Sequence, residues 1–307
     1  IPVGIRKIDA KISPPGGAAA QYYMPPSEDL SRAGSTWYPA NGRTRFPLWS
    51  EPTTAYHEGV PGHHLQCGLV VDLGDALTRF QRTIGWNSGH GEGWALYAER
   101  LMGELGYLAE PAHELGMLRA HALRAVRVII DIGMHLELRV PATEPGIGGE
   151  VWTPALGLRF ADEHARLPEH QLGFEVDRYL GIPGQAISYK VGERVWLESR
   201  AAAMTRHGDA FDLRAWHAYA LALGPLVGKL EQGHLCGQAR RQDLVCVCCA
   251  VLGAVLGPRG RVHRVNVHMQ YPYVYVCICI YIYTHIYHIY ICICIYAHAY
   301  LYVYVYA

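Results

Sequence analysis

The sequence predicts a mainly α-helical protein with a looped N-terminal segment. Apolar residues recur at helical spacing from Thr53 to about Gln232, and Gly and Pro divide that region at intervals that suit short helices. Residues 1–52 are instead rich in Pro and Gly, which favours an extended, loop-rich lead-in. Residues 233–307 differ from both regions in composition. We therefore expect three regions: a lead-in at 1–52, a helical region at 53–232 and a tail at 233–307.

The expected elements follow from the local pattern. Short strands are expected in the lead-in, around Gln21–Met24 and Thr36–Tyr38. In the helical region, Pro and Gly residues such as Pro61-Gly62 and Pro183-Gly184 mark the ends of helices. The expected helices are Thr53–Val60, His64–Leu73, Glu92–Glu104, Ala112–Leu138, Pro154–Ala165, Leu172–Leu180, Gly184–Arg206 and Asp212–Leu223.

The tail is a low-complexity segment that we do not expect to be a native domain. It holds five of the 27 Lys and Arg, one of the 27 Asp and Glu, and eight of the nine Cys. Residues 271–307 are long enough for a membrane helix, which needs about 20 apolar residues. Twelve of the 21 Tyr lie there, however, and each hydroxyl would need a partner in lipid. The alternation favours translated dinucleotide-repeat DNA over a membrane anchor. The Cys-Val-Cys-Cys run at 246–249 has no matching Cys or His pair at zinc-finger spacing.

Composition excludes several classes of protein. The formal net charge of zero argues against a nucleic-acid partner, and the 50% hydrophobic content argues against a disordered chain. Only Cys67 precedes the tail, so no disulfide framework is expected in the helical region. The chain opens at Ile1 without a basic segment followed by an apolar one, so the sequence shows no signal peptide and assigns no compartment.

The residues with the clearest chemistry lie in the string HEGVPGHHLQ, which holds His57, Glu58, His63 and His64. Two His residues one helical turn apart can grip Zn²⁺, with a Glu beside the bound water. In a continuous helix, His57 and His64 would lie about 10 Å apart along the axis, too far to share one ion with Zn–N bonds of about 2.0–2.1 Å. Pro61-Gly62 does not suit a regular helix interior. The spacing therefore predicts a helix that is broken at Pro61-Gly62.

A zinc site also needs a third ligand, and the string EGWALYAERL supplies two carboxylates for it. Glu92 lies near an expected helix start, between glycines that permit close backbone approach. Glu99 lies seven residues later, on the same helix face. The order His-Glu, His, Glu is that of a gluzincin-like zinc peptidase. We expect Glu92 to be the third ligand and Glu99 to support a ligand or to form an ion pair.

Five strings in the same order resemble the domain-of-unknown-function 885 family, over roughly Tyr22 to Gln232. They are HEGVPGHHLQ, EGWALYAERL, RAVRVIIDIGMH, EVDRYLGIPGQAISYKVG and FDLRAWHAYALALGPLVGKLE. The resemblance implies a multi-helical, zincin-like metallopeptidase fragment, with His63 preferred to His64 as the second ligand. Members of this family are often described as bacterial lipoproteins. They usually carry a helical N-terminal half that this chain lacks, so we expect it to be a truncated piece.

The resulting hypothesis is the hydrolysis of a peptide substrate by a zinc-activated water. The expected metal ligands are His57, His63 and Glu92, with Glu58 as the general base. Tyr189 is the candidate donor to the oxyanion that develops on the substrate.

Four further residues have two interpretations each. Asp131 and His135, one helical turn apart, either hold a ligand in place or form a buried polar pair. Arg178 and Lys190 either bind the C-terminal carboxylate of a peptide or form surface ion pairs.

Two other functions remain open at this stage. One is a non-catalytic truncated fragment or pseudoenzyme. The other is a di-iron helical bundle built on Glu-x-x-His pairs. Such pairs occur at Glu110–His113 and Glu231–His234, but Pro111 and Gly233 interrupt them, so the sequence favours this function least.

Overall fold

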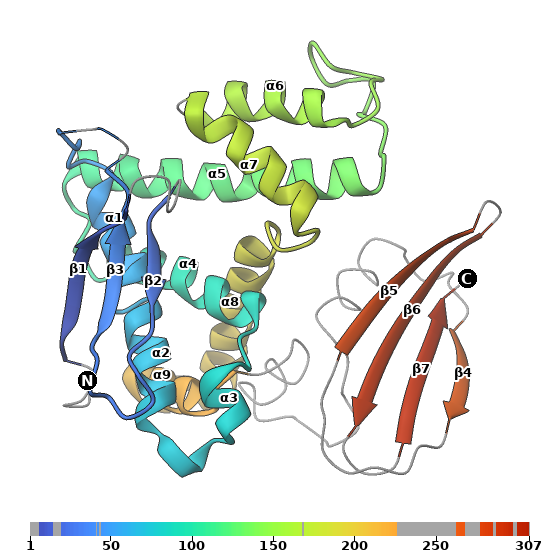
Figure 1. Ribbon diagram of the computed structural model, residues 1–307. Coiled ribbons are helices and arrows are strands. Elements are labelled where there is room, and N and C mark those ends of the chain that lie inside the picture. Colours follow the sequence, from blue (N-terminus) through green and yellow to red (C-terminus); the bar gives the residue numbers. More distant parts are fainter. Residues whose placement is uncertain are drawn as a thin grey trace. The chain divides into compact units, whose positions relative to one another are not determined.

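The computed structural model describes residues 6–14, 20–40, 42, 44–167 and 169–225, and the strands at 262–267, 277–284, 287–296 and 300–306. The chain divides into two compact units. Among the described residues, the first unit holds a small sheet and the helices, which confirms the expected mainly helical fold (Figure 1). The second unit holds a separate sheet.

The first unit begins with a three-stranded sheet. Its strands are β1 (Ile8–Ile12), β2 (Tyr22–Met24) and β3 (Gly34–Tyr38), in the order β1-β3-β2. β3 is central: it pairs in parallel with β1 and antiparallel with β2. β2 and β3 are the two expected strands, whereas β1 was not expected. The Ile-Asp-Ala-Lys-Ile sequence of β1 alternates apolar and polar residues, but the exposed positions are Ile8, Ala10 and Ile12, so the alternation does not mark a buried apolar face.

The helices follow the sheet. The long ones are α4 (Ser88–Glu104), α5 (Pro111–His135) and α8 (Ser188–His207). The shorter ones are α1 (Glu51–Glu58), α2 (His63–Asp72), α3 (Arg79–Thr83), α6 (Pro154–Ala165), α7 (Glu169–Gly181) and α9 (Leu213–Ala222). Short 3₁₀ turns lie at Gly74–Ala76 and Gly208–Ala210.

Helix starts show where the sequence prediction was accurate and where it was not. α6 has the expected bounds, because Thr153 caps it and Pro154 begins it. α4 begins four residues before Glu92, because the Asn87 side chain accepts a hydrogen bond from the His90 backbone N–H at 3.0 Å. α8 begins at Ser188 rather than at Gly184, since residues 182–187 form turns. α3 was not expected, although Thr78 and Gln81 form a capping box there.

Two groups of buried side chains form the core of the first unit. α5, α6 and α7 enclose one group, which includes Ile130, Leu156, Val176 and Tyr179. The other group lies among α4, α8 and α9 and is built largely from aromatic rings: Trp94, Tyr97, Trp196 and Trp216. In Figure 1, α6 and α7 lie along α5, while α4 and α8 lie together at the centre of the unit.

The central pair, α4 and α8, makes an unusually close crossing. Gly93 of α4 faces Gly192 of α8, and a Cβ on Gly192 would overlap the carbonyl oxygen of Gly89. Only glycine fits at this distance, so the two helices are in direct backbone contact. The crossing fixes the N-terminal half of α4, which carries Glu92.

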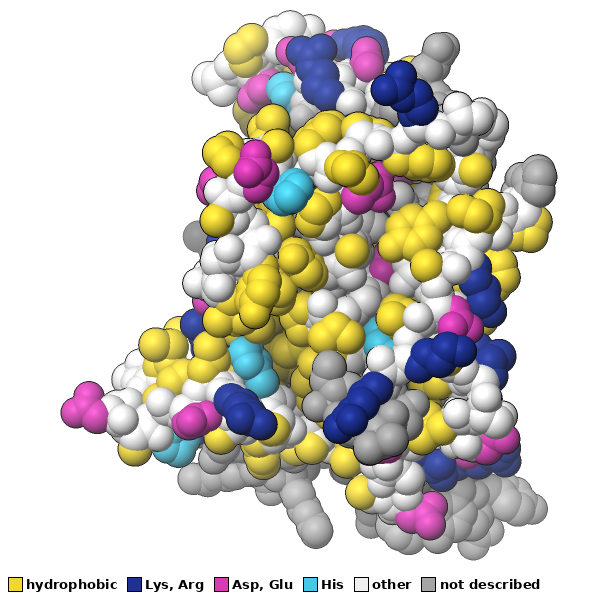
Figure 2. Space-filling view, turned by 90° about the vertical axis from the view of Figure 1, so that its left-hand side faces the viewer, with side chains coloured by type: hydrophobic (Ala, Val, Ile, Leu, Met, Phe, Trp, Pro, Cys, Tyr) yellow, Lys and Arg dark blue, Asp and Glu magenta, His cyan; other side chains and the backbone are white. Residues whose placement is uncertain are grey.

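One face of the molecule is apolar at its middle. In Figure 2, apolar side chains gather across the centre of this face, while most Lys and Arg side chains lie nearer its edges.

In the described part of the chain, no helix is both long and apolar enough to cross a membrane.

The second unit is a four-stranded antiparallel sheet in the order β4-β7-β6-β5. Its strands are β4 (Val262–Val267), β5 (Cys277–Thr284), β6 (Tyr287–Tyr296) and β7 (Tyr300–Tyr306). The Cys-Val-Cys-Cys run at 246–249 and the Glu231–His234 pair lie outside the described residues.

Candidate metal centre

The string HEGVPGHHLQ forms two helices rather than one, as the spacing of its histidines required. α1 ends at Glu58, residues 59–62 form a turn, and α2 begins at His63. In the turn, the Gly62 N–H donates to the Tyr56 carbonyl at 3.0 Å, and a Cβ on Gly62 would overlap the carbonyl oxygens of Tyr56 and His57. This tight turn brings the rings of His57 and His63 to a centroid distance of 4.8 Å.

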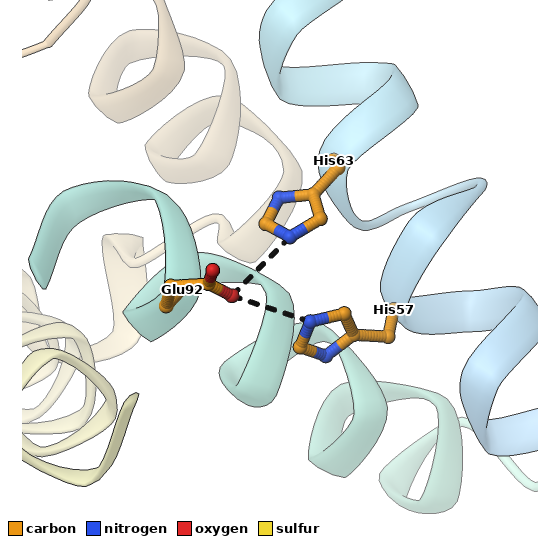
Figure 3. A group of neighbouring side chains, drawn as sticks. All are labelled: His57, His63 and Glu92. Atoms are coloured by element: carbon orange, nitrogen blue, oxygen red, sulfur yellow. Dashed lines mark ion pairs between the residues drawn. The ribbon is translucent and has the colours of Figure 1, made fainter. Parts of the chain in front are cut away.

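Glu92 of α4 completes a group of three possible metal ligands (Figure 3). Its Oε2 lies 3.4 Å from Nε2 of His57 and 3.4 Å from Nε2 of His63. One ligand atom from each residue lies within 4.8 Å of the other two, and both histidines are buried. The structure thus brings together the three side chains that the sequence predicted as ligands.

The spacing of these atoms suits a zinc ion. Two ligands of a tetrahedral zinc site, with bonds of about 2.0–2.1 Å, lie about 3.3 Å from each other. The two Nε2–Oε2 distances are close to that value. In addition, Glu92 Oε2 is buried and makes no hydrogen bond with the described residues. A carboxylate oxygen and two imidazole nitrogens form a donor set that zinc accepts, so the residues present fit this metal.

Glu99, seven residues after Glu92 on α4, holds His57 from the opposite side. Its Oε1 lies 2.7 Å from Nδ1 of His57, and its Oε2 accepts a hydrogen bond from the Thr53 hydroxyl at 2.6 Å. A carboxylate on Nδ1 fixes the proton there and leaves Nε2 as the free electron-pair donor. Nε2 is the atom that faces Glu92. Glu99 thus lies in the supporting position that the sequence interpretation gave it.

Contacts between the carboxylates and the histidines shift the pKa values of His57, Glu92 and Glu99. Burial acts to lower the pKa of His57, but contacts with Glu92 and Glu99 outweigh it and raise that pKa to about 9. Burial acts to raise the pKa of Glu92, yet contacts with His57 and His63 hold it well below its usual range. For Glu99, burial is likewise outweighed by His57 and Arg124, so its pKa is about 2. Both carboxylates are therefore ionised at neutral pH.

Glu58 and Trp94 lie at the turn between the two histidines. The Glu58 side chain is buried, and its Oε2 makes no hydrogen bond with the described residues. Trp94 donates from its indole N–H to the carbonyl of Pro61 at 2.8 Å. Glu92 and Trp94 lie on the same helix, so α4 supplies a possible ligand and also holds the turn that positions His63.

Tyr189, the candidate oxyanion donor, lies beside His57. Their ring centroids are 6.3 Å apart and the planes are inclined by 20°. The Tyr189 side chain is buried, and its hydroxyl accepts a hydrogen bond from Arg178 Nη2 at 3.0 Å. Burial raises the pKa of Tyr189, so the phenol keeps its proton at neutral pH.

The other residues that the sequence predicted make their contacts outside the group of three possible ligands. The Nδ1 of His64 lies 2.8 Å from the Tyr23 hydroxyl of β2, so His64 faces the sheet and not Glu92. Asp131 accepts a hydrogen bond from the Gly184 N–H at 3.1 Å and lies 3.2 Å from His135. Asp131 is buried and His135 is 28% exposed, and the Asp131 carboxylate holds the segment before α8 through Gly184.

Lys190 is directed away from its neighbour Tyr189. Its Nζ lies 2.8 Å from Glu193 and 3.0 Å from Nδ1 of His121. The sequence interpretation did not include His121, Thr53 or Trp86, whose ring lies 5.6 Å from that of His63. Thr53 lies one helical turn before His57 on α1 and donates to Glu99, while His121 of α5 lies 3.7 Å from Glu99. No sequence motif marks either residue.

The di-iron alternative finds no support in the described part of the chain. His57, His63 and Glu92 form the one group of three or more possible metal ligands found among the described residues. Glu110 and His113, at the start of α5, are not part of it.

The chain was compared with known proteins. The family described as "Bacterial protein of unknown function (DUF885)" matches residues 1–228. No curated protein matches the chain. A solved structure described as "putative lipoprotein from Colwellia psychrerythraea" shares 30% sequence identity and a TM-score of 0.64, and the match covers 75% of this chain. A "putative lipoprotein of unknown function from Shewanella oneidensis" shares the fold, at 21% identity over 65% of this chain and a TM-score of 0.53. The matches cover only 37% and 36% of those two chains.

Proposed function

The chain belongs to the DUF885 family, and on that premise we propose that it is a zinc-dependent hydrolase of peptide bonds with a zincin-like site. One observation supports this proposal most directly. His57, His63 and Glu92 converge on one point from three different helices, with ligand atoms within 4.8 Å of one another. The contact of Glu99 with His57 Nδ1 adds to it, because metal-binding histidines commonly donate their second ring N–H to a carboxylate.

The surrounding side chains supply the remaining chemistry. A zinc ion held by these three residues would polarise a carbonyl and lower the pKa of a bound water to about 7. We assign to Glu58, which directly follows His57 in sequence, the role of accepting a proton from that water and passing it to the leaving amine. Its Oε2 has no hydrogen-bond partner among the described residues, so its lone pairs are available. The Tyr189 hydroxyl accepts from Arg178, which leaves its own proton for donation to the oxyanion.

Substitution Glu58→Gln tests the assignment of the base. The amide keeps the size of the side chain but cannot take up a proton, so we expect zinc stoichiometry to stay at one per chain. Peptide hydrolysis should fall by about 10²-fold or more, which is the usual contribution of a general base. Atomic absorption and a peptide cleavage assay measure the two quantities. Glu114→Gln, an exposed carboxylate at the start of α5, is the matched control. Parent-level hydrolysis by E58Q would show that Glu58 is not the base.

A second candidate is a chain that binds zinc without turnover of its own. The observation that favours it is length, since the chain spans about a third of the two solved relatives. Part of the wall around a substrate would then lie in sequence that this chain does not contain. One zinc ion per chain, with no cleavage of any peptide by the unaltered protein, would support this candidate over the first.

A further inference from the structure

Tyr189 lies between the candidate metal centre and three arginines. One neighbour of its ring is His57, at a centroid distance of 6.3 Å. The guanidinium carbons of Arg124, Arg127 and Arg178 lie 5.7, 4.9 and 5.9 Å from the centroid of the same ring. We call these three residues the arginine cluster. They come from α5 and α7, so three positive charges meet next to the candidate metal centre.

Glu175 neutralises one member of the cluster. It accepts hydrogen bonds from Nε and Nη2 of Arg127 at 2.9 and 2.7 Å, and a third from the Tyr179 hydroxyl at 2.5 Å. This bidentate pair is the strong geometry for a guanidinium and a carboxylate. Arg178 approaches the same carboxylate only to 3.9 Å. Glu175 is therefore mainly committed to Arg127.

The second carboxylate near the cluster is also committed. Glu99 lies 3.9 Å from Arg124, but its closer contacts are His57 at 2.7 Å and Thr53 at 2.6 Å. Three guanidinium groups thus share two carboxylates that already have other partners. The three guanidinium groups outnumber the carboxylates that contact them, and this surplus of positive charge favours the binding of an anion.

Arg178 is the member best placed to receive an anion. Its side chain is 20% exposed, whereas that of Arg127 is 6% exposed. Both of its hydrogen bonds with described residues leave from Nη2, to Gln185 at 2.6 Å and to Tyr189 at 3.0 Å. Its Nε and Nη1 make no hydrogen bond with the described residues. They do not share an edge of the guanidinium, so each can donate one hydrogen bond to a carboxylate oxygen.

We propose that Arg178 binds the C-terminal carboxylate of a peptide, and that the chain therefore removes residues from the C-terminal end. This inference rests on the proposed peptide hydrolysis. The terminal carboxylate lies one residue, about 3.8 Å, beyond the carbonyl that is cleaved. Arg178 and His57 both approach the Tyr189 ring, at 5.9 and 6.3 Å from its centroid. A carboxylate bound to Arg178 would therefore suit a peptide whose cleaved bond lies one or two residues before its C-terminus. Water adds across the scissile C–N bond and yields a shortened peptide acid and a free amino acid or dipeptide.

The first test uses the unaltered, zinc-loaded chain. Octapeptides of random sequence are supplied in two forms, with a free C-terminal carboxylate and with a C-terminal amide, and the products are identified by mass spectrometry. We expect loss of the last one or two residues from the free acids, at a rate at least tenfold above that for the amides. Equal internal cleavage of both forms would overturn the inference and leave the proposed function intact. No cleavage of either form would count against the proposed hydrolysis itself.

The second test substitutes the arginine. Arg178→Gln should raise KM for the free acids about tenfold or more and bring the acid-to-amide rate ratio close to one, with zinc stoichiometry unchanged. The matched control is Arg194→Gln, which removes an exposed arginine that pairs with Glu198 at 2.6 Å on α8. An unchanged KM and rate ratio in folded R178Q would contradict the inference. If R178Q does not fold, the comparison of free acids with amides in the unaltered chain tests whether the terminal carboxylate is recognised.

Discussion

His63 and His64 are adjacent in sequence but serve different parts of the fold. Successive residues on an α-helix point about 100° apart, so only one of the two can face Glu92. His63 Nε2 lies 3.4 Å from Glu92, while His64 Nδ1 lies 2.8 Å from the Tyr23 hydroxyl. The first contact belongs to the candidate metal centre, and the second joins α2 to the sheet.

This difference predicts opposite results for two substitutions. His63→Ala removes a ligand and should reduce zinc affinity by a factor of 100 or more. His64→Ala should keep one zinc per chain but lower the unfolding temperature, because it removes a buried side chain and its hydrogen bond with the Tyr23 hydroxyl. Calorimetric zinc titration and thermal unfolding separate the two effects. Loss of zinc from H64A with retention by H63A would reverse the ligand assignment.

The protonation of His57 predicts how metal binding depends on pH. In the metal-free chain its pKa is about 9, because the neighbouring carboxylates outweigh the effect of burial. Zinc must displace that proton, so affinity should rise about tenfold per pH unit up to about pH 9. Because this pKa lies above the ordinary value of about 6.5, the stabilisation of the metal-free fold by protonated His57 is complete below about pH 6.5 and is lost as pH rises through 9.

Calorimetry in buffers of different ionisation enthalpy measures this coupling. Zinc binding at pH 7 should release close to one proton from His57. Thermal unfolding of the metal-free chain across pH 6.5 to 9.5 supplies the independent check. Zinc binding without proton release at pH 7 would show that His57 is already neutral.

At the scale of elements, the crossing of α4 and α8 determines where Glu92 lies. The helices touch at Gly93 and Gly192, where no side chain separates their backbones. α4 also reaches the turn at residues 59–62 through the indole of Trp94. One helix thus connects the core to two parts of the candidate metal centre.

Gly192→Ala tests this connection. The added Cβ would overlap the carbonyl oxygen of Gly89, so α4 and α8 must move apart. We expect this to lower the free energy of unfolding by about 1–3 kcal/mol. We expect a lower unfolding temperature and weaker zinc binding, because α4 moves with Glu92. Gly173→Ala on α7 is the matched control: no atom lies within 4 Å of its added Cβ, and Ala favours a helix by about 1 kcal/mol. If G192A is destabilised but binds zinc as tightly as the parent, the crossing of α4 and α8 does not control the candidate metal centre.

At the scale of the whole molecule, the candidate centre and both groups of core side chains lie in the first unit. A chain that ends at Ala239 should therefore keep its zinc affinity and should unfold within about 3 °C of the full chain, a shift that corresponds to about 1 kcal/mol. Gel filtration, thermal unfolding and zinc titration compare the two chains. A truncated chain that fails to fold would show that the first unit depends on residues after 239.

The sequence by itself determined the helical class, most helix positions and the two strings that contain the candidate ligands. Helical periodicity and Pro or Gly at helix ends are local properties that can be read from the sequence. The strings that contain His57-Glu58, His63 and Glu92 indicate metal binding by their residue types and order. The sequence also required a break at Pro61-Gly62, since an unbroken helix separates the histidines along its axis.

Only the tertiary structure decided which neighbouring histidine faces Glu92, that Glu99 binds His57 Nδ1, and that three arginines surround Tyr189. Each of these contacts joins residues from different helices, at least 11 positions apart in the chain. Such contacts depend on how the helices cross, which the packing of α4 on α8 and of α7 on α5 sets. Periodicity within one helix carries no information about the rotation of that helix against another, so these contacts required the assembled fold.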